Sequence, residues 1–191
     1  MTKRHFGELL ENQQKEGHHV CVNLGIRADQ IPKRLLDHRD KVAATRIFDE
    51  ELIEATKRQA GLYKIDPARY GDGIGLLDAM VLIGDAVHAA HHEAPTVPVI
   101  IDGKYATGEL AIAALKHHDA DGLTISPYLG RGVFEPLLQR ADKGIWVVCR
   151  TSHEGADGIQ TLPVNSVTSQ TTHRKYCSPL YTVVASQIRR D

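Results

Sequence analysis

Hydrophobic residues follow two alternating patterns along the chain: short continuous runs, and longer segments with helical spacing. The continuous runs are rich in β-branched residues, as in the buried strands of a parallel sheet. They predict strands over residues 19–25, 62–65, 97–101, 121–127 and 144–150. Between them, apolar residues recur every three or four positions, which predicts helices over 6–15, 42–60, 76–94, 109–118, 134–141 and 179–189. Strands separated by helices indicate an α/β fold with a parallel sheet and right-handed crossovers.

Turn-forming residues punctuate these elements without dividing the chain. Gly17, Gly61 and Pro95 stand at predicted helix ends, where glycine and proline commonly stop a helix. Residues 151–176 form a long polar segment that we predict to be a loop. Because no linker or low-complexity segment interrupts the pattern, the sequence predicts a single domain over residues 1–191.

The third predicted strand ends in two charged residues. Asp102 and Lys104 follow the apolar run 97–101, and ligands bind at the carboxyl ends of the strands in α/β sheets. If the strand continued through these residues, their side chains would share one face. A carboxylate paired with an ammonium group is a candidate proton-transfer site. The alternative is a structural salt bridge at a strand end.

Two other predicted strands also end in polar residues. Lys64 lies at the end of the second strand and Ser126 at the end of the fourth. In a barrel or a curved sheet the carboxyl ends of the strands converge. We therefore expect Lys64, Asp102 and Lys104 to form an array of alternating charge, which favours a functional site over an isolated salt bridge.

Composition and charge narrow the class of protein. The chain has 191 residues, 42% hydrophobic and 25% charged, which is typical of a globular domain with a sizeable core. Its formal net charge of −1 gives no electrostatic basis for binding nucleic acid or an anionic membrane. The sequence shows neither an apolar run of about 18–20 residues nor an apolar signal region. We therefore expect a cytoplasmic protein.

The cysteines suggest reduced thiols. Cys21, Cys149 and Cys177 are odd in number and far apart, which does not suit a disulfide framework. Cys21 and Cys149 lie in apolar, strand-like runs, so we expect them to be small buried residues.

Three histidines near the end of one predicted helix raise the question of a metal site. His88, His91 and His92 have helical spacing, which could place two ligands on one face. No cysteine or aspartate completes a recognisable ligand set in this segment. We expect a solvated helix end and no metal.

Six segments carry a family resemblance. In chain order they are Val20–Leu24, Tyr63-Lys64, Val99–Lys104, Asp121–Gly130, Gly144–Ala156 and Pro179-Leu180-Tyr181. Together they resemble orotidine 5′-phosphate decarboxylase in its longer bacterial form, and they span nearly the whole chain. The resemblance implies a TIM barrel that dimerises with its active sites at the subunit interface. It also implies decarboxylation of orotidine monophosphate to uridine monophosphate without a cofactor.

The resemblance also implies roles for individual residues. Lys104 matches the lysine of an Asp-x-Lys-x-x-Asp motif, which protonates the carbanion left by carbon dioxide. Asp102 matches the acid before it, and Lys64 matches the lysine of the second strand. Gln160 matches a glutamine of the flexible loop that reaches the nucleotide. The remaining substrate-binding positions implied are Asn23, Thr107 and Ser126.

The sequence departs from the family pattern in three places. Thr107 stands near the position of the second motif aspartate. Gly25 stands where the first strand normally ends in an aspartate that holds the ribose. The pattern stops after the fifth βα unit, without the last three strands and their phosphate-binding loop. We therefore expect an incomplete TIM-barrel series whose open edges are covered by a second copy or by a partner subunit.

These features predict an orotidine 5′-phosphate decarboxylase-like lyase. Lys104 would transfer a proton after the loss of carbon dioxide or a related leaving group. The departures remove charges and phosphate contacts on which such catalysis depends, so we expect an altered pyrimidine nucleotide or a small acid as substrate. The alternative is a non-catalytic paralogue that binds a nucleotide or acts as a subunit of a larger assembly. We expect a homodimer that needs no cofactor and binds neither nucleic acid nor membrane.

Overall fold

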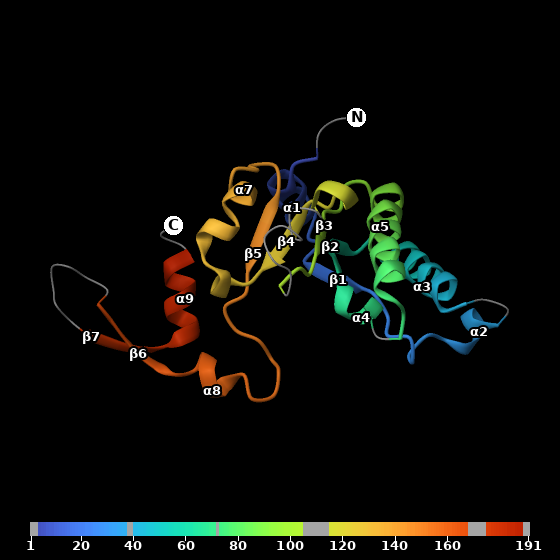
Figure 1. Cartoon of the computed structure of the whole chain (residues 1–191). Helices are drawn as coiled ribbons and strands as arrows, with labels where there is room; N and C mark the ends of the chain where they lie inside the picture. Colours follow the sequence, from blue (N-terminus) through green and yellow to red (C-terminus); the bar gives the residue numbers. More distant parts are fainter. Residues whose placement is uncertain (1–3, 38–39, 72, 105–114, 168–174, 189–191) are drawn as a thin grey trace. The chain divides into compact units, whose positions relative to one another are not determined.

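The structure, a computed structural model, describes residues 4–37, 40–71, 73–104, 115–167 and 175–188. The chain divides into two compact units. The first comprises Met1–Ile125 and Arg131–Trp146, and the second comprises Ser126–Gly130 and Val147–Asp191. Figure 1 labels the helices and strands of both.

A five-stranded sheet forms the centre of the first unit. Its strands, in spatial order, are β1 (Val20–Leu24), β2 (Ala60–Ile65), β3 (Val99–Ile101), β4 (Gly122–Ile125) and β5 (Gly144–Val147). The pairs from β1 to β4 are parallel, which confirms the predicted α/β class. Since β1 and β5 stand at the two ends of this order, the sheet that the described residues form is open. An open sheet of this kind is what we expected from an incomplete barrel series.

Helices connect the strands of this unit. They are α1 (Phe6–Lys15), α2 (Lys33–Leu36), α3 (Lys41–Thr56), α4 (Pro67–Gly71), α5 (Leu76–Glu93) and α7 (Glu135–Leu138), with the 3-10 turn η2 (Arg131–Val133). The Asp40 carboxylate caps α3 by accepting a hydrogen bond of 2.8 Å from the Ala43 amide, a contact that stabilises the first turn of a helix. Helices α3 and α5 lie side by side and both contact the sheet (Figure 1).

The N-terminal helix packs against the face of the sheet that also carries Lys64. Phe6 of α1 forms a buried cluster with Leu62 and Ile100, and Leu62 stands two residues before Lys64 on β2, hence on the same face. A Cβ atom added to Gly144 would overlap the Phe6 ring. Glycine is therefore the residue that lets α1 approach β5 this closely.

The second unit is built around a hairpin and a helix. Its elements are η1 (Pro127–Leu129), α8 (Asp157–Gln160), the antiparallel pair β6 (Pro163–Val167) and β7 (Lys175–Pro179), and α9 (Leu180–Ile188). The Arg150 guanidinium lies 5.1 Å from the centre of the Tyr181 ring, within the range of a cation–π contact. Because α8 and β6 lie within residues 151–176, the prediction of a loop over this range was wrong. Side chains around β6 are mostly exposed, so no hydrophobic period marks the strand.

Several element boundaries differ from the sequence prediction, among them the boundary between α3 and β2. Helix α3 ends at Thr56, and Ala60 and Gly61 open β2 instead of closing the helix. A Cβ atom on Gly61 would overlap the carbonyl oxygen of His18. The glycine that we took for a helix stop thus permits the close approach of the segment that enters β1.

Several apolar residues are more exposed than expected. Met80 and Val81, part of the predicted apolar pattern of α5, are exposed; the helix instead buries Ala79, Leu82, Ile83, Ala86, Val87 and Ala90. Cys21 is exposed and Cys149 half-buried, contrary to the expected burial. Cys21 lies on β1, which stands at one end of the sheet, so only one neighbouring strand flanks it.

Of the helix predicted over 109–118, residues 115–118 are helical and the remainder lies outside the described residues. Thr107 also lies outside them. Across the part of the chain that the structure describes, none of the helices combines the length and the apolar character needed to cross a membrane.

Candidate active site

Asp102 is the centre of the candidate site. Strand β3 ends at Ile101, three residues before Lys104, so Asp102 and Lys104 do not share a strand face. The Asp102 amide donates a hydrogen bond of 2.7 Å to the Ile65 carbonyl at the end of β2. This bond fixes the backbone at the point where the two strands end, and it holds the Asp102 side chain in a buried position, 7% exposed.

The structure brings the three predicted charged residues together. Lys64 Nζ lies 3.2 Å and Lys104 Nζ 2.5 Å from the same carboxylate oxygen of Asp102, Oδ2. Lys64 belongs to β2 and Lys104 to the turn after β3, so the array spans two neighbouring strand ends. Their catalytic role stays a prediction.

A fourth side chain completes the contacts of Asp102. The Thr124 hydroxyl, on β4, donates a hydrogen bond of 2.5 Å to Asp102 Oδ1. Thr124 was not predicted from the sequence because threonine is uncharged and common in strands. Its place follows from the strand register: β3 and β4 pair Ile100 with Gly122, and two residues further on Asp102 stands opposite Thr124.

These contacts determine the charge of Asp102. Burial disfavours ionisation, but hydrogen bonds from Lys104 and Thr124 and the charges of Lys104 and Lys64 outweigh it, so the pKa of Asp102 is lowered. The carboxylate is therefore ionised at neutral pH. The lysine side chains remain partly accessible, 30% for Lys64 and 18% for Lys104, so an ammonium group can reach a ligand above the carboxylate and transfer a proton.

Replacing Thr124 with valine should raise the pKa of Asp102, because the carboxylate loses the hydroxyl that stabilises its ionised form. Carboxyl ¹³C shifts followed against pH measure this change. Thr45→Val is the matched control, since the buried Thr45 hydroxyl donates to the Lys41 carbonyl in α3. An unchanged Asp102 titration in Thr124→Val would contradict the assignment.

The end of β1 is shaped differently from the family pattern. Asn23 is the register partner of Lys64, which places it beside the charged array. Gly25 follows with a backbone φ of 101°, a conformation that residues other than glycine adopt only with strain. A Cβ atom there would also lie 3.2 Å from the Asp66 carbonyl oxygen. The local backbone therefore disfavours an aspartate at position 25.

Ser126 and Gln160, two further predicted binding residues, lie in the second unit. Ser126 directly precedes η1. The Gln160 side chain is hydrogen-bonded to Thr151 at both ends: its oxygen accepts from the Thr151 amide at 2.8 Å, and its nitrogen donates to the Thr151 hydroxyl at 3.0 Å. These bonds close the segment between β5 and α8. Their roles in binding stay predictions.

The histidines of α5 have separate environments. His92 is exposed, whereas His91 Nε2 lies 3.2 Å from Asp121 Oδ2 and its side chain is only 18% exposed. The expectation of a solvated helix end was therefore wrong for His91, which packs against a buried acid. Within the described ranges, no three histidine, cysteine or acidic side chains are grouped so as to hold a metal ion.

The parallel βα series with polar residues gathered at its strand ends defines an α/β protein of the TIM-barrel type. No family model matches the chain. An orotidine 5′-phosphate decarboxylase of Natronomonas pharaonis is 35% identical over 153 residues, which are 76% of this chain and 53% of that protein. The enzyme of that name from Cupriavidus metallidurans is 32% identical over 187 residues, 95% of this chain and 62% of that protein.

A solved structure agrees with these matches. The OMP decarboxylase of Leishmania donovani superposes with a TM-score of 0.74 at 26% identity, covering 96% of this chain and 64% of that one. The resemblance inferred from the sequence is confirmed: the chain is a relative of the orotidine 5′-phosphate decarboxylases. It spans about half the length of the first curated relatives that it matches, 53% and 51%.

Proposed function

We propose that residues 1–191 form one lyase domain of the orotidine 5′-phosphate decarboxylase type. The observation that carries the proposal is the convergence of Lys64 and Lys104 on the buried carboxylate of Asp102. Two ammonium groups around one carboxylate, at the carboxyl ends of neighbouring parallel strands, match the chemistry that the relatives' name describes.

The proposed reaction needs a proton donor and fixed charges. The bond between the substrate's ring carbon and its carboxylate breaks, carbon dioxide leaves, and the electron pair stays on the carbon. Lys104 Nζ donates a proton to that carbon and regains one from water. Asp102 holds the ammonium group in place, and Lys64 balances the charge of Asp102. Charges held in position before the reaction stabilise the transition state without reorganisation.

The substrate is proposed to be an altered pyrimidine nucleotide or a small acid. The support is the end of β1, where Gly25 supplies no carboxylate and its φ of 101° disfavours one. A nucleotide held by a carboxylate at this strand end would lose that contact here. The substrate should therefore depend less on its ribose than on its reacting carboxylate.

Two measurements on the purified chain test the function. Calorimetry with uridine monophosphate measures binding, and a spectroscopic assay with orotidine monophosphate measures decarboxylation. Turnover supports the lyase. Binding without turnover favours the non-catalytic nucleotide-binding paralogue. Absence of both, together with no turnover of small carboxylic acids, would overturn the lyase proposal.

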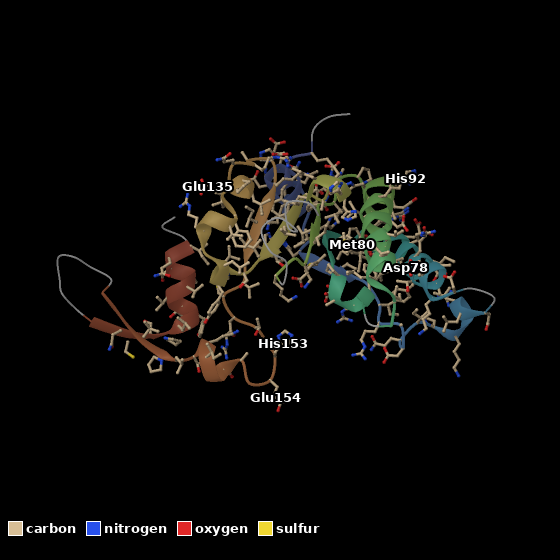
Figure 2. The ribbon with its side chains drawn as sticks, in the orientation of Figure 1. Asp78, Met80, His92, Glu135, His153 and Glu154 are labelled. Atoms are coloured by element: carbon tan, nitrogen blue, oxygen red, sulfur yellow. The ribbon has the colours of Figure 1, made fainter. Side chains whose placement is uncertain are left out.

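We further propose that the chain forms a homodimer. The N-terminal half of α5 exposes four apolar side chains, Leu76, Leu77, Met80 and Val81, next to Asp78, and Figure 2 labels Met80 and Asp78 on this helix. An apolar cluster of this kind is typical of a surface that another chain covers.

Leu77→Lys should shift the chain from dimer to monomer in gel filtration with light scattering, because it places a charge in the apolar contact. Leu77 is 82% exposed, so the change should leave the fold intact. Ile159→Lys, at an exposed position of α8 in the second unit, serves as the control. A wild-type chain that stays monomeric at every concentration would refute the dimer.

A further inference from the structure

Asp49 is a buried carboxylate that the proposed reaction does not use. It lies on α3, is 2% exposed, and has two hydrogen-bond donors from other elements. The Gly25 amide, just after β1, donates to Oδ1 at 3.0 Å, and the Tyr70 hydroxyl, on α4, donates to Oδ2 at 2.6 Å. One side chain thus joins α3, the end of β1 and the helix that follows β2.

Burying a carboxylate here destabilises its charged form. Burial raises the pKa of Asp49 to about 6, although the hydrogen bonds from Tyr70 and Gly25 act in the opposite direction. An apolar residue would avoid this penalty. An apolar residue could fill the same space but could not accept the hydrogen bonds from Gly25 and Tyr70.

A short series of backbone hydrogen bonds leads from Asp49 to Asp102. Asp49 accepts from Gly25, whose preceding residue, Leu24, accepts from the Asp66 amide at 3.2 Å. Ile65, which precedes Asp66, accepts from the Asp102 amide at 2.7 Å. The first step joins α3 to the end of β1, and each later step crosses from one strand end to the next. The series thereby connects the Gly25 amide with the residue that both lysines contact.

We infer that Asp49 is a positioning residue for the candidate active site, holding the ends of β1 and β2, and through them the Asp102 backbone, in a fixed arrangement. This inference rests on the proposed function for what the positioning serves. The fixed arrangement of the strand ends is inferred from the hydrogen bonds of the folded chain alone.

The charged and titratable groups around Asp49 come from four segments. Arg46 and Glu50 lie beside it on α3, Tyr70 on α4, Asp66 before α4, and Asp85 on α5. Burial, together with the negative charge of Asp49, raises the pKa of Tyr70 well above its usual value. The phenol therefore stays protonated and remains a donor when Asp49 changes its charge.

The wild-type chain should show this linkage in an amide NMR titration without any substrate. The Gly25, Asp66 and Asp102 amide signals should move together with one midpoint, at about pH 6, because protonation of Asp49 weakens the first hydrogen bond of the series. Asp102 does not cause this midpoint, since its own pKa lies below the usual value.

Variants identify the titrating group. Asp49→Asn should abolish the common midpoint at all three amides, whereas Glu50→Gln, an exposed neighbour on the same helix, should retain it. Tyr70→Phe removes a hydrogen bond that favours the charged form, so the midpoint should move to higher pH. This third variant keeps the test valid if Asp49→Asn fails to fold.

The decisive observation is whether the NMR signal of the Asp102 amide shifts with pH. If it stays still while the Gly25 amide titrates, Asp49 anchors β1 alone and the inference is overturned. A midpoint retained in Asp49→Asn overturns it as well. Because the measurement needs no turnover, a negative decarboxylation assay would count against the proposed function and leave this result intact.

Discussion

Lys104→Ala should abolish turnover on whichever acid the chain proves to decarboxylate. A positioned proton donor typically contributes about 10²–10⁴-fold to a rate, and Lys104 is the ammonium group nearest to Asp102, at 2.5 Å. The loss should appear mainly in kcat, because the proton is needed only after the carboxylate has left. Steady-state kinetics with the substrate identified by the assay measure both constants.

Lys15→Ala is the matched control for this experiment. Lys15 also pairs with an acid, Glu11, at 3.3 Å, but both side chains are 70% exposed at the end of α1. Its removal should leave kcat and KM unchanged, as is usual for exposed ion pairs. Full activity in Lys104→Ala would refute Lys104 as the proton donor, and the array would then be a structural salt bridge.

Asp121→Asn should cause a large loss of stability in the first unit. Asp121 is 1% exposed and accepts two hydrogen bonds of 2.8 Å from Arg4 and one of 2.9 Å from the Val99 amide. Removing one charge of a buried pair leaves the other unpaired, which costs about 3–5 kcal/mol. Urea unfolding followed by circular dichroism measures the free energy of unfolding.

Asp119→Asn controls for the loss of a nearby charge. Asp119 is 80% exposed and pairs with Lys143 at 3.4 Å, so its replacement should change the free energy of unfolding by less than about 1 kcal/mol. Equal effects of the two substitutions would show that the Arg4 contact contributes nothing beyond a surface ion pair.

The pKa of Asp121 also determines how the stability of the first unit should depend on pH. Burial alone would raise the pKa of Asp121, but hydrogen bonds from Arg4 and His91 lower it to about 2. A carboxyl group with a depressed pKa in the folded state stabilises the fold above its unfolded pKa, and this contribution is lost as the pH falls. The wild-type chain should therefore lose stability between about pH 4 and pH 2, and Asp121→Asn should lose less over that range.

The charged centre of the site could be predicted because it depends on a general rule of α/β sheets. Lys64, Asp102 and Lys104 each follow an apolar run, and parallel strands bring their carboxyl ends to one edge. Thr124 was not predicted, since its contact with Asp102 depends on the register between β3 and β4, and the sequence prediction assigned strands without assigning their register.

Other features depended on contacts that no local pattern records. Asp49 looks like an ordinary polar residue of an amphipathic helix, and only the packing of α3 against the end of β1 shows that it is buried. The hairpin of β6 and β7 is held by backbone pairing, and the residues of β6 whose burial is described are exposed or half-buried, so no hydrophobic periodicity marked it. The burial of His91 was also not predicted, because its partner Asp121 lies 30 residues away in the sequence.

The contacts of the N-terminal helix have a consequence for the order in which the chain folds. Arg4 and its partner Asp121 are 117 residues apart, and the Phe6 ring rests against Gly144. A helix of ten residues is marginally stable alone in water. During synthesis, α1 leaves the ribosome before β4 and β5, and it must therefore wait, unpacked, until they have emerged. Formation of this unit should then be slow, because elements that are far apart in the sequence must meet before it is packed.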